Sequence, residues 1–411
     1  MKKHFEIINK IIEYEIYLYI IFMFLTKGEA IRNILIFSAF TLWLVTLPYR
    51  ENKYILKEPV PLLFWGFIAT ILLSVIFSVD PVYSFKSLRG QPLKSLILLC
   101  LISTTLANEK SLKRLMYLFY FILVFTVLVS YYSFWAHDLY YMYPDTSLRH
   151  ANPNRLAEDL NMLLSFSFML LLIVKNRNLR FAVTITVITG VAALILSGSR
   201  TGLAAFLIIG GILLFYLATK GKINIKILVA GIISVIILSA TVTHYSESWI
   251  KIKFKFFTQV IATFNGRTPI WIPLIHAVRE RPVTGWGYGE KLFRIDRPFK
   301  NTPYKVAPIA DHPSHRNPHN AFFRVLFHQG ILGLIFYITL LIVAVSSFWR
   351  GAFKAEYYNN YVLIACTSVV AGTFIIHAIV ESSHLTHLVL ILGTGLAAKN
   401  MGGNLNWDHS P

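Results

Sequence analysis

The stretch Asp311-His-Pro-Ser-His-Arg-Asn-Pro-His-Asn-Ala-Phe-Phe-Arg-Val-Leu-Phe-His-Gln-Gly-Ile-Leu-Gly333 joins a polar, basic loop directly to a strongly apolar helix. Asn317-Pro318 has the form of a helix start, because Asn caps free backbone N–H groups and Pro fits the first helical position. We therefore expect His319 in the first helical turn, at the lip of a membrane span. A titratable side chain held there by a rigid element suits catalysis; the alternative is a loop histidine at a membrane interface.

The composition predicts an all-α polytopic membrane protein. Hydrophobic residues make up 55% of the 411 residues and charged residues 14%, with a mean hydropathy of +0.58, whereas soluble domains carry about 25% charged residues. Cys100 and Cys366 both lie in apolar runs, so no disulfide framework or cysteine-based metal site is expected. The net charge of +19 gathers mainly between the apolar runs. This pattern fits membrane topology and an anionic substrate better than nucleic acid.

About twelve apolar runs approach the roughly 20 residues that a spanning helix needs. They cover residues 13–26, 31–48, 60–79, 91–107, 114–135, 156–174, 179–197, 202–219, 225–243, 320–348, 358–380 and 384–398. The stretch Ser197-Gly-Ser-Arg-Thr-Gly202 is either a hairpin between two spans or a kink in one. The chain thus divides into spans one to nine (1–243), a large loop with short helices (244–319), spans ten to twelve (320–400) and a tail (401–411).

Lysine and arginine predict the orientation, because cytoplasmic connections carry the excess of both. Alternate connections hold the richer set, Lys2/Lys3/Lys10, Arg50/Lys53/Lys57, Lys110/Lys113/Arg114, Lys175/Arg177/Arg180, Lys220/Lys222/Lys226 and Arg350/Lys354. Both termini are therefore expected inside, and the 244–319 loop outside. Within that loop Ile270–Arg281 has the pattern of a short amphipathic helix. Trp249–Phe257 suits a short strand or an interfacial segment.

Two arginines are candidates for binding an anion. Arg200 sits in a small-residue break at membrane depth, where ionisable groups are costly and usually functional. The alternative, an arginine that extends to the outer interface, is disfavoured by the positive-inside rule. Arg267 lies in Asn265-Gly-Arg-Thr-Pro-Ile-Trp271, ahead of the amphipathic helix. A guanidinium and free N–H groups can meet an anion there, and a solvated loop arginine is the alternative.

Two groups of histidines have suggestive spacings. The first is His312, His315 and His319, whose proline-broken loop without cysteine argues against a metal site. A continuous helix would place the second group on one face, namely His377, Glu381, His384 and His387. Packing between spans is the alternative for that second group. Gly285-Trp-Gly-Tyr-Gly289 lacks the preceding strand of a nucleotide-binding loop, so a plain loop is favoured over a sugar-stacking turn.

The chain carries Arg200, Arg267 and His319 in this order, and the last two bound most of a large outside loop. This arrangement resembles that of the O-antigen ligase family, which shares its core domain with O-antigen polymerases. The family pattern is His-Asn/Ser/Gln, nine residues, Gly, two residues and Gly/Thr/Tyr. His319-Asn320, Gly330 and Gly333 meet it. Ser199-Arg200-Thr201 meets the arginine-containing break after a span, and Gly266-Arg267 the Gly-Arg of the loop.

The resemblance implies an inverting glycosyltransferase without metal or cofactor at the periplasmic face of a Gram-negative inner membrane. It would move O-polysaccharide from undecaprenyl diphosphate to a sugar hydroxyl of lipid A–core, among membrane lipids and with no nucleic acid partner. His319 would be the base, and Arg200 and Arg267 would hold the pyrophosphate. Further substrate-binding candidates are Arg89, Arg316, Asn320 and Glu381.

Two rival functions stay open at this point. An O-antigen polymerase would use the same donor with a second lipid-linked glycan as acceptor. A flippase or transporter of lipid-linked glycan would carry out no chemistry. Transporters usually place polar groups mid-span and often show paired repeats, whereas the polar residues here gather at the outer surface.

Overall fold

The computed structural model describes residues 2–25, 28–136, 153–222, 270–293, 295, 297–299, 318–355, 358–379 and 385–401. Every regular element within these residues is a helix. The α-helices are α1 (Lys2–Met23), α2 (Glu29–Thr46), α3 (Pro59–Ile76), α4 (Pro81–Leu88), α5 (Gln91–Thr105), α6 (Glu109–Ala136), α7 (Pro153–Ile173), α8 (Arg177–Leu196), α9 (Arg200–Thr219), α13 (Ala321–Lys354), α14 (Tyr358–Ile379) and α15 (Leu385–Met401). Short 3-10 helices are η1 (Leu47–Tyr49), η2 (Glu51–Lys57), η3 (Glu290–Phe293) and η4 (Arg297–Phe299).

These helices follow the predicted apolar runs closely at most ends. Seven of the described helices are long and apolar enough to cross a membrane, the shortest of them Pro59–Ile76. The chain is therefore a polytopic membrane protein. The predicted run at 225–243 and the segment Trp249–Phe257 lie outside the described residues. The first helix starts earlier than predicted, at Lys2, and its Glu13 is buried against Arg114 at 3.0 Å.

Polar side chains and prolines set where the helices begin. Asp80 accepts a hydrogen bond from the Tyr83 N–H at 3.0 Å and starts α4, with Pro81 at its first position. Asn176 caps α8 in the same way through the Leu179 N–H. Such caps satisfy backbone donors that the helix itself leaves unpaired. The break at 197–202 is a hairpin, because α8 ends at Leu196 and α9 begins at Arg200.

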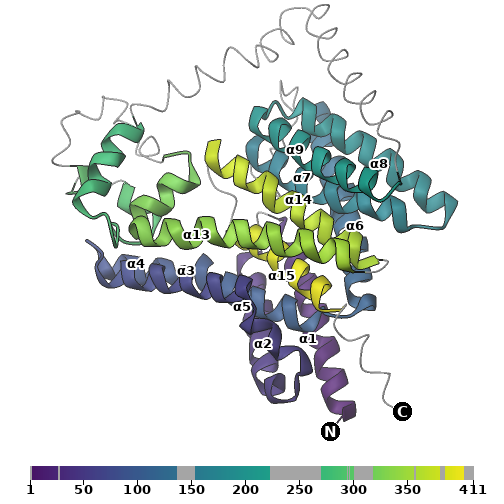
Figure 1. Cartoon of the computed structure of the whole chain (residues 1–411), viewed down its shortest axis with the longest axis horizontal. Helices are drawn as coiled ribbons and strands as arrows, with labels where there is room; N and C mark the ends of the chain where they lie inside the picture. Colours follow the sequence, from purple (N-terminus) through teal and green to yellow (C-terminus); the bar gives the residue numbers. More distant parts are fainter. Residues whose placement is uncertain are drawn as a thin grey trace, which may run out of the picture.

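The helices form two groups around α13. Figure 1 shows α3 and the long part of α13 side by side, with α6 to α9 gathered at one end and α1 and α2 projecting away. Helices α3 and α14 both pack on α13. Helix α15 packs on α5 and α14. Every residue of α15 from Thr386 to Ala398 is buried. Helix α15 is therefore a fixed inner element of the protein.

The predicted amphipathic helix at Ile270–Arg281 is confirmed, since residues 270–280 are helical. Its buried face carries Leu274 and Ala277, and its exposed face carries Arg279. The buried residues share a separate small core with Trp286 and Phe327. This core attaches the 270–293 segment to the beginning of α13.

Candidate functional site

Helix α13 begins three residues later than the sequence predicted. Asn320, in an extended conformation, is the cap, and its side chain accepts from the Phe323 N–H at 3.0 Å. Pro318 therefore stands outside the helix, and Asn317 lies outside the described residues. Asn320 is the better cap because it directly precedes the apolar run, so its oxygen reaches the first free N–H groups. His319 precedes the first turn instead of lying in it.

His319 has a left-handed backbone conformation, with φ 46°, and among the described residues it is the one non-glycine residue with positive φ. Such a conformation costs on the order of 1–3 kcal/mol and persists only where the surroundings impose it. Here both neighbours are buried, and the carbonyl of Pro318 accepts a hydrogen bond from the Trp271 indole at 2.7 Å. The side chain of His319 itself is partly exposed. A strained, solvent-accessible histidine on a fixed support suits a catalytic base.

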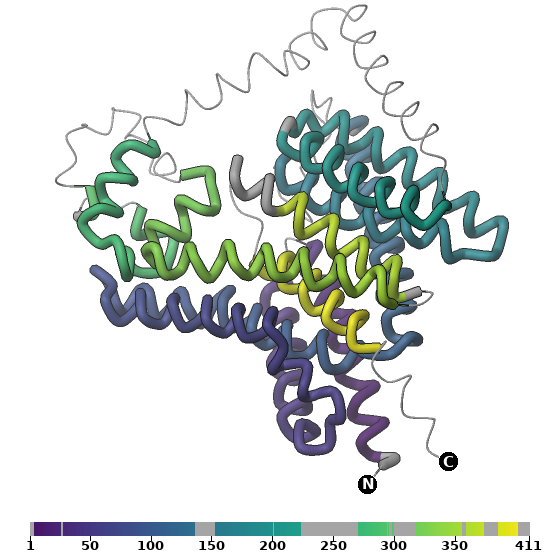
Figure 2. The backbone as a smooth tube through the Cα atoms, viewed as in Figure 1, coloured from purple at the N-terminus to yellow at the C-terminus, as the bar shows by residue number. Residues whose placement is uncertain are grey.

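The predicted span at 320–348 corresponds to α13, but the helix has a break at Gly330 (φ 67°, ψ −165°) that was not predicted. In a straight helix residues 322 and 337 would stand about 22 Å apart, yet the rings of Phe322 and Tyr337 have centroids 6.0 Å apart. Figure 2 shows the first turns of α13 standing off the axis of its long remainder. Residues 331–354 alone are long enough to cross a membrane.

The loop at 282–289 fills the break. The Ile331 N–H donates to the Pro282 carbonyl at 2.8 Å, and the Trp286 N–H donates to the Phe327 carbonyl at 2.9 Å. A Cβ on Gly330 would lie 2.3 Å from the Val283 oxygen, so only glycine fits the contact. The break thus exchanges helical hydrogen bonds for bonds to a loop that is distant in sequence.

The glycine string at 285–289 is more than a plain loop. Gly285 and Gly287 have positive φ and lie against α13 and α3–α4, respectively. Trp286 is 3% exposed, and its indole N–H donates to the Ala277 carbonyl at 2.7 Å, so it holds the 270–280 helix and has no face free for a sugar. Sequence reasoning missed this structural role.

Charged and phenolic groups surround the start of α13. Arg324, one turn after the cap, forms an ion pair with Glu290, whose side chain is 54% exposed. Burial raises the pKa of Tyr288 to about 12, with smaller opposed influences from Arg324 and Glu290. The Tyr83 hydroxyl accepts from the Lys291 N–H at 3.0 Å. Neither Arg324 nor Glu290 was predicted from the sequence, although the position of Arg324 one turn past Asn320 was a usable signal.

A second helix start bears Arg200. Ser199 caps α9 through the Gly202 N–H at 3.1 Å and donates to Asn154 of α7 at 2.8 Å. The Asn161 amide of α7 donates to the Gly202 carbonyl at 2.9 Å. Arg200 is the first residue of α9, and its side chain lies outside the description. Its backbone is therefore fixed on both sides.

Tyr337 is buried against the start of α13, with its ring centroid 6.0 Å from that of Phe322 and 5.4 Å from that of Phe67 on α3. No sequence signal pointed to Tyr337, since the break at Gly330 is what brings it there.

The other predicted site residues are mostly beyond the described ranges. Arg267, Arg316, Glu381, His312, His315 and His384 all lie in the gaps. Arg89 is exposed at the end of α4, with its guanidinium 4.6 Å from the ring centroid of Phe85. Asn320 is buried as the cap of α13. Within the described residues no group of three or more His, Cys, Asp or Glu side chains is arranged to hold a metal ion.

The second histidine group includes one described side chain. Helix α14 ends at Ile379 and α15 begins at Leu385, and the residues between them lie outside the described ranges. His387 is buried, 3.1 Å from Asp159 of α7 and edge-on to the ring of Phe24. His387 therefore packs between helices, as the alternative reading of this group proposed.

A scan against family models matches residues 185–338 to the family described as O-antigen ligase. The match runs from α8 into α13 and contains the start of α9, the 270–280 helix, His319 and the break at Gly330. No curated protein matches the chain. The family takes in ligases and polymerases that act on lipid-linked glycans. Residues 185–338 of this multi-pass membrane protein thus match the O-antigen ligase family, whose members are membrane glycosyltransferases.

Proposed function

We propose that this protein is an O-antigen ligase, which transfers O-polysaccharide from undecaprenyl diphosphate to a sugar hydroxyl of lipid A–core. The observation that carries the proposal is the strained, partly exposed His319 at the start of the broken helix α13, inside the matched domain. The donor's long lipid and the acceptor's lipid A both require an enzyme within the membrane, in accord with the polytopic fold.

His319 acts as the general base. Its neutral imidazole takes the proton of the acceptor hydroxyl as that oxygen attacks the anomeric carbon of the donor. The new C–O bond forms on the face opposite the old one, which breaks and releases undecaprenyl diphosphate. This displacement inverts the anomeric configuration. A positioned base of this kind contributes about 10²–10⁴-fold to a rate.

Arg200 and Arg267 hold the diphosphate and stabilise the charge that grows on it. Arg200 opens α9, so the N–H groups and dipole of that helix favour an anion beside it. Two arginines supply the electrostatic stabilisation that a divalent cation gives other enzymes. Arg89, Arg316 and Glu381 are proposed as further substrate contacts, as is Asn320, whose side chain also caps α13.

Arg324 and Glu290 serve the acceptor side. Arg324 is the residue whose N–H bonds to the carbonyl of Asn320, one turn from His319. Its partner Glu290 exposes a carboxylate that can accept hydrogen bonds from sugar hydroxyls. The ion pair keeps the guanidinium of Arg324 occupied, so that the anionic donor is left to Arg200 and Arg267.

The proposed setting is a bacterial inner membrane, with the 244–319 loop and the starts of α7, α9, α13 and α15 facing the periplasm. Twelve spans with both termini inside satisfy the lysine and arginine distribution of the connections. This arrangement gathers His319, Arg200 and Arg267 on one side. The lipid-facing surface carries large exposed apolar residues, such as Phe181 and Ile188 of α8.

A genetic experiment separates the ligase from its rivals. Loss of a ligase leaves core without O-antigen while lipid-linked polymer accumulates. Loss of a polymerase leaves core with a single repeat, and loss of a flippase leaves lipid-linked repeats on the cytoplasmic side. In the null strain, wild type is expected to restore the full ladder and His319→Ala is not. His4→Ala, an exposed histidine at the far end of α1, is the matched control. Restoration by His319→Ala would overturn the proposed mechanism.

A further inference from the structure

We propose that the buried pair of Asp159 and His387 positions Arg200 for the diphosphate of the donor. This inference rests on the proposed function, in which Arg200 binds that diphosphate. Neither residue of the pair belongs to the proposed catalytic set. They act through α7, which carries Asp159, and through the capped start of α9 beside it.

The pair is buried deep in the protein. Asp159 Oδ1 and His387 Nε2 are 3.1 Å apart, and the two residues are 5% and 4% exposed. Burying a carboxylate in such surroundings is costly unless it is paired. Ionisable groups inside a membrane protein usually serve its function for this reason. The pair joins α7 to α15, two helices that are distant in sequence.

Its α15 side is immobile. His387 is the third residue of α15, a helix whose next eleven residues are all buried, and the ring of Phe24 lies edge-on at 5.6 Å. Helix α15 also packs along α5. The imidazole is therefore a fixed point against which α7 is held.

On the α7 side, hydrogen bonds join the helix to the residues that flank Arg200-Thr201. Asn154 and Asn161, one on either side of Asp159, bond to Ser199 and to the Gly202 carbonyl. These are the residues just before and just after the pair Arg200-Thr201. Gly202 also approaches α7 so closely that a Cβ there would lie 2.3 Å from the Cβ of Ala157. Any movement of the start of α7 therefore moves Arg200.

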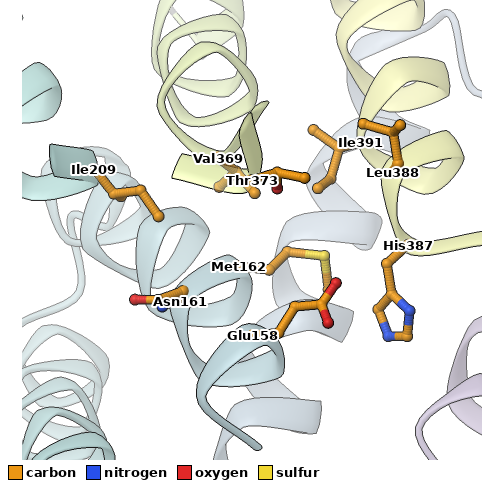
Figure 3. Close-up of a pocket in the computed structure, with 9 residues that line it drawn as sticks. All are labelled: Glu158, Asn161, Met162, Ile209, Val369, Thr373, His387, Leu388 and Ile391. Atoms are coloured by element: carbon orange, nitrogen blue, oxygen red, sulfur yellow. The ribbon is translucent and has the colours of Figure 1, made fainter. Parts of the chain in front are cut away.

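A small cavity adjoins His387 of the pair. It lies between α7, α9, α14 and α15, with apolar walls that include Met162, Ile209 and Ile391. Figure 3 shows the Glu158 side chain beside Met162, directed toward the side of the cavity where His387 lies. The contact between Asp159 and His387 joins α7 to α15 beside this cavity.

The test is a transfer assay on purified protein in nanodiscs, with donor and acceptor varied separately. Asp159→Ala and His387→Ala are each expected to raise the donor KM at least about tenfold, since small misplacements of a binding group are costly. The acceptor KM is expected to stay within about twofold. The exchange variant, Asp159→His with His387→Asp, restores the contact and is expected to recover most of the donor affinity.

The control is Glu13→Gln. Glu13 is as buried as Asp159 and is bonded to Arg114 at 3.0 Å and Tyr17 at 2.7 Å, but it joins α1 to α6. This variant should lower stability without changing the donor KM. Equal changes in both KM values, or the same pattern in Glu13→Gln, would mean a purely structural role. If the alanine variants do not fold, Asp159→Asn and His387→Gln are judged by the same criteria.

Binding of undecaprenyl diphosphate alone separates this inference from the proposed function. The inference expects weaker binding by the Asp159 and His387 variants whether or not the wild type transfers glycan to lipid A–core. A wild type that binds the diphosphate but does not ligate would sink the function and leave the inference standing. A wild type that does not bind it, or variants that bind it equally well, would overturn the inference.

Discussion

Replacing Gly330 by alanine is the sharpest test of the broken helix. The residue has φ 67° and ψ −165°, a region that is almost exclusive to glycine and costs other residues about 1–3 kcal/mol. The new methyl would also lie 2.3 Å from the Val283 oxygen and 2.6 Å from the Pro282 oxygen. Overpacking of this kind adds about 1–3 kcal/mol. The expected loss is therefore about 2–6 kcal/mol in the free energy of unfolding, the sum of these two ranges.

The protein can lower this cost only by moving the 282–289 loop away from α13. That movement would lose the bond between the Ile331 N–H and the Pro282 carbonyl and would shift the segment bearing His319. A displacement of 1 Å at a reacting group costs about 10²-fold in rate. We therefore expect Gly330→Ala to lower both the melting temperature in detergent and the transfer rate.

Gly210→Ala is the matched control, because Gly210 lies within α9 and a Cβ there meets nothing within 4 Å. Alanine is favoured over glycine in a helix by about 0.5–1 kcal/mol. The control should therefore be neutral or slightly more stable, with normal transfer. If Gly330→Ala and Gly210→Ala behaved alike in both assays, the break in α13 would not be the constraint described here.

Three further predictions concern the start of α13. His319→Gln should reduce transfer by about 10²–10⁴-fold while donor binding, measured with undecaprenyl diphosphate, stays unchanged; equal loss of binding would contradict its role as base. Asn320→Ala should destabilise the protein by about 0.5–2 kcal/mol through loss of the cap, seen as a lower melting temperature. The pKa of Tyr288, raised to about 12 in the fold, favours the protonated phenol. Its stabilising contribution is therefore complete below the unfolded pKa of about 10 and is lost as pH rises through 12. Between pH 10 and 12, the free energy of unfolding should fall less steeply with pH in Tyr288→Phe than in the wild type. The difference in phenolate absorbance between the two proteins should titrate near 12.

The helices were predictable because hydropathy acts locally. A run of about 20 apolar residues is a span whatever surrounds it, and polar caps and prolines mark its ends. The hairpin at 197–202 was left open as a hairpin or a kink, since Gly198 and the serines allow both. Contacts between helices, which no local pattern encodes, determine that this stretch is a hairpin.

The errors at the start of α13 have a different cause. Asn317-Pro318 and Asn320 both have the chemistry of a helix start, and the choice between them depends on the apolar run and on the Trp271 bond to Pro318. The break at Gly330 depends on Pro282 and Val283, about fifty residues upstream in the sequence. Glycine was noted there as part of a family pattern, but its conformation follows from a partner that the pattern does not contain.

These contacts together explain the spacing of nine residues between His319-Asn320 and Gly330. The 321–329 segment is about 14 Å long and the 270–280 helix about 16 Å, so the two are matched in length. They are tied at one end by the Trp271 indole and Pro318, and at the other by Pro282 and Ile331. Between the ties, the rings of Trp271 and Phe323 are 5.2 Å apart, and Leu274 and Phe327 share one core. The two segments are thus joined at both ends, and neither end can move alone. Because His319 lies at one of these ends, its strained conformation is imposed by the contacts along both segments and not by its neighbours only. A helix without the break would lose the second tie, and the histidine could then relax to an ordinary conformation.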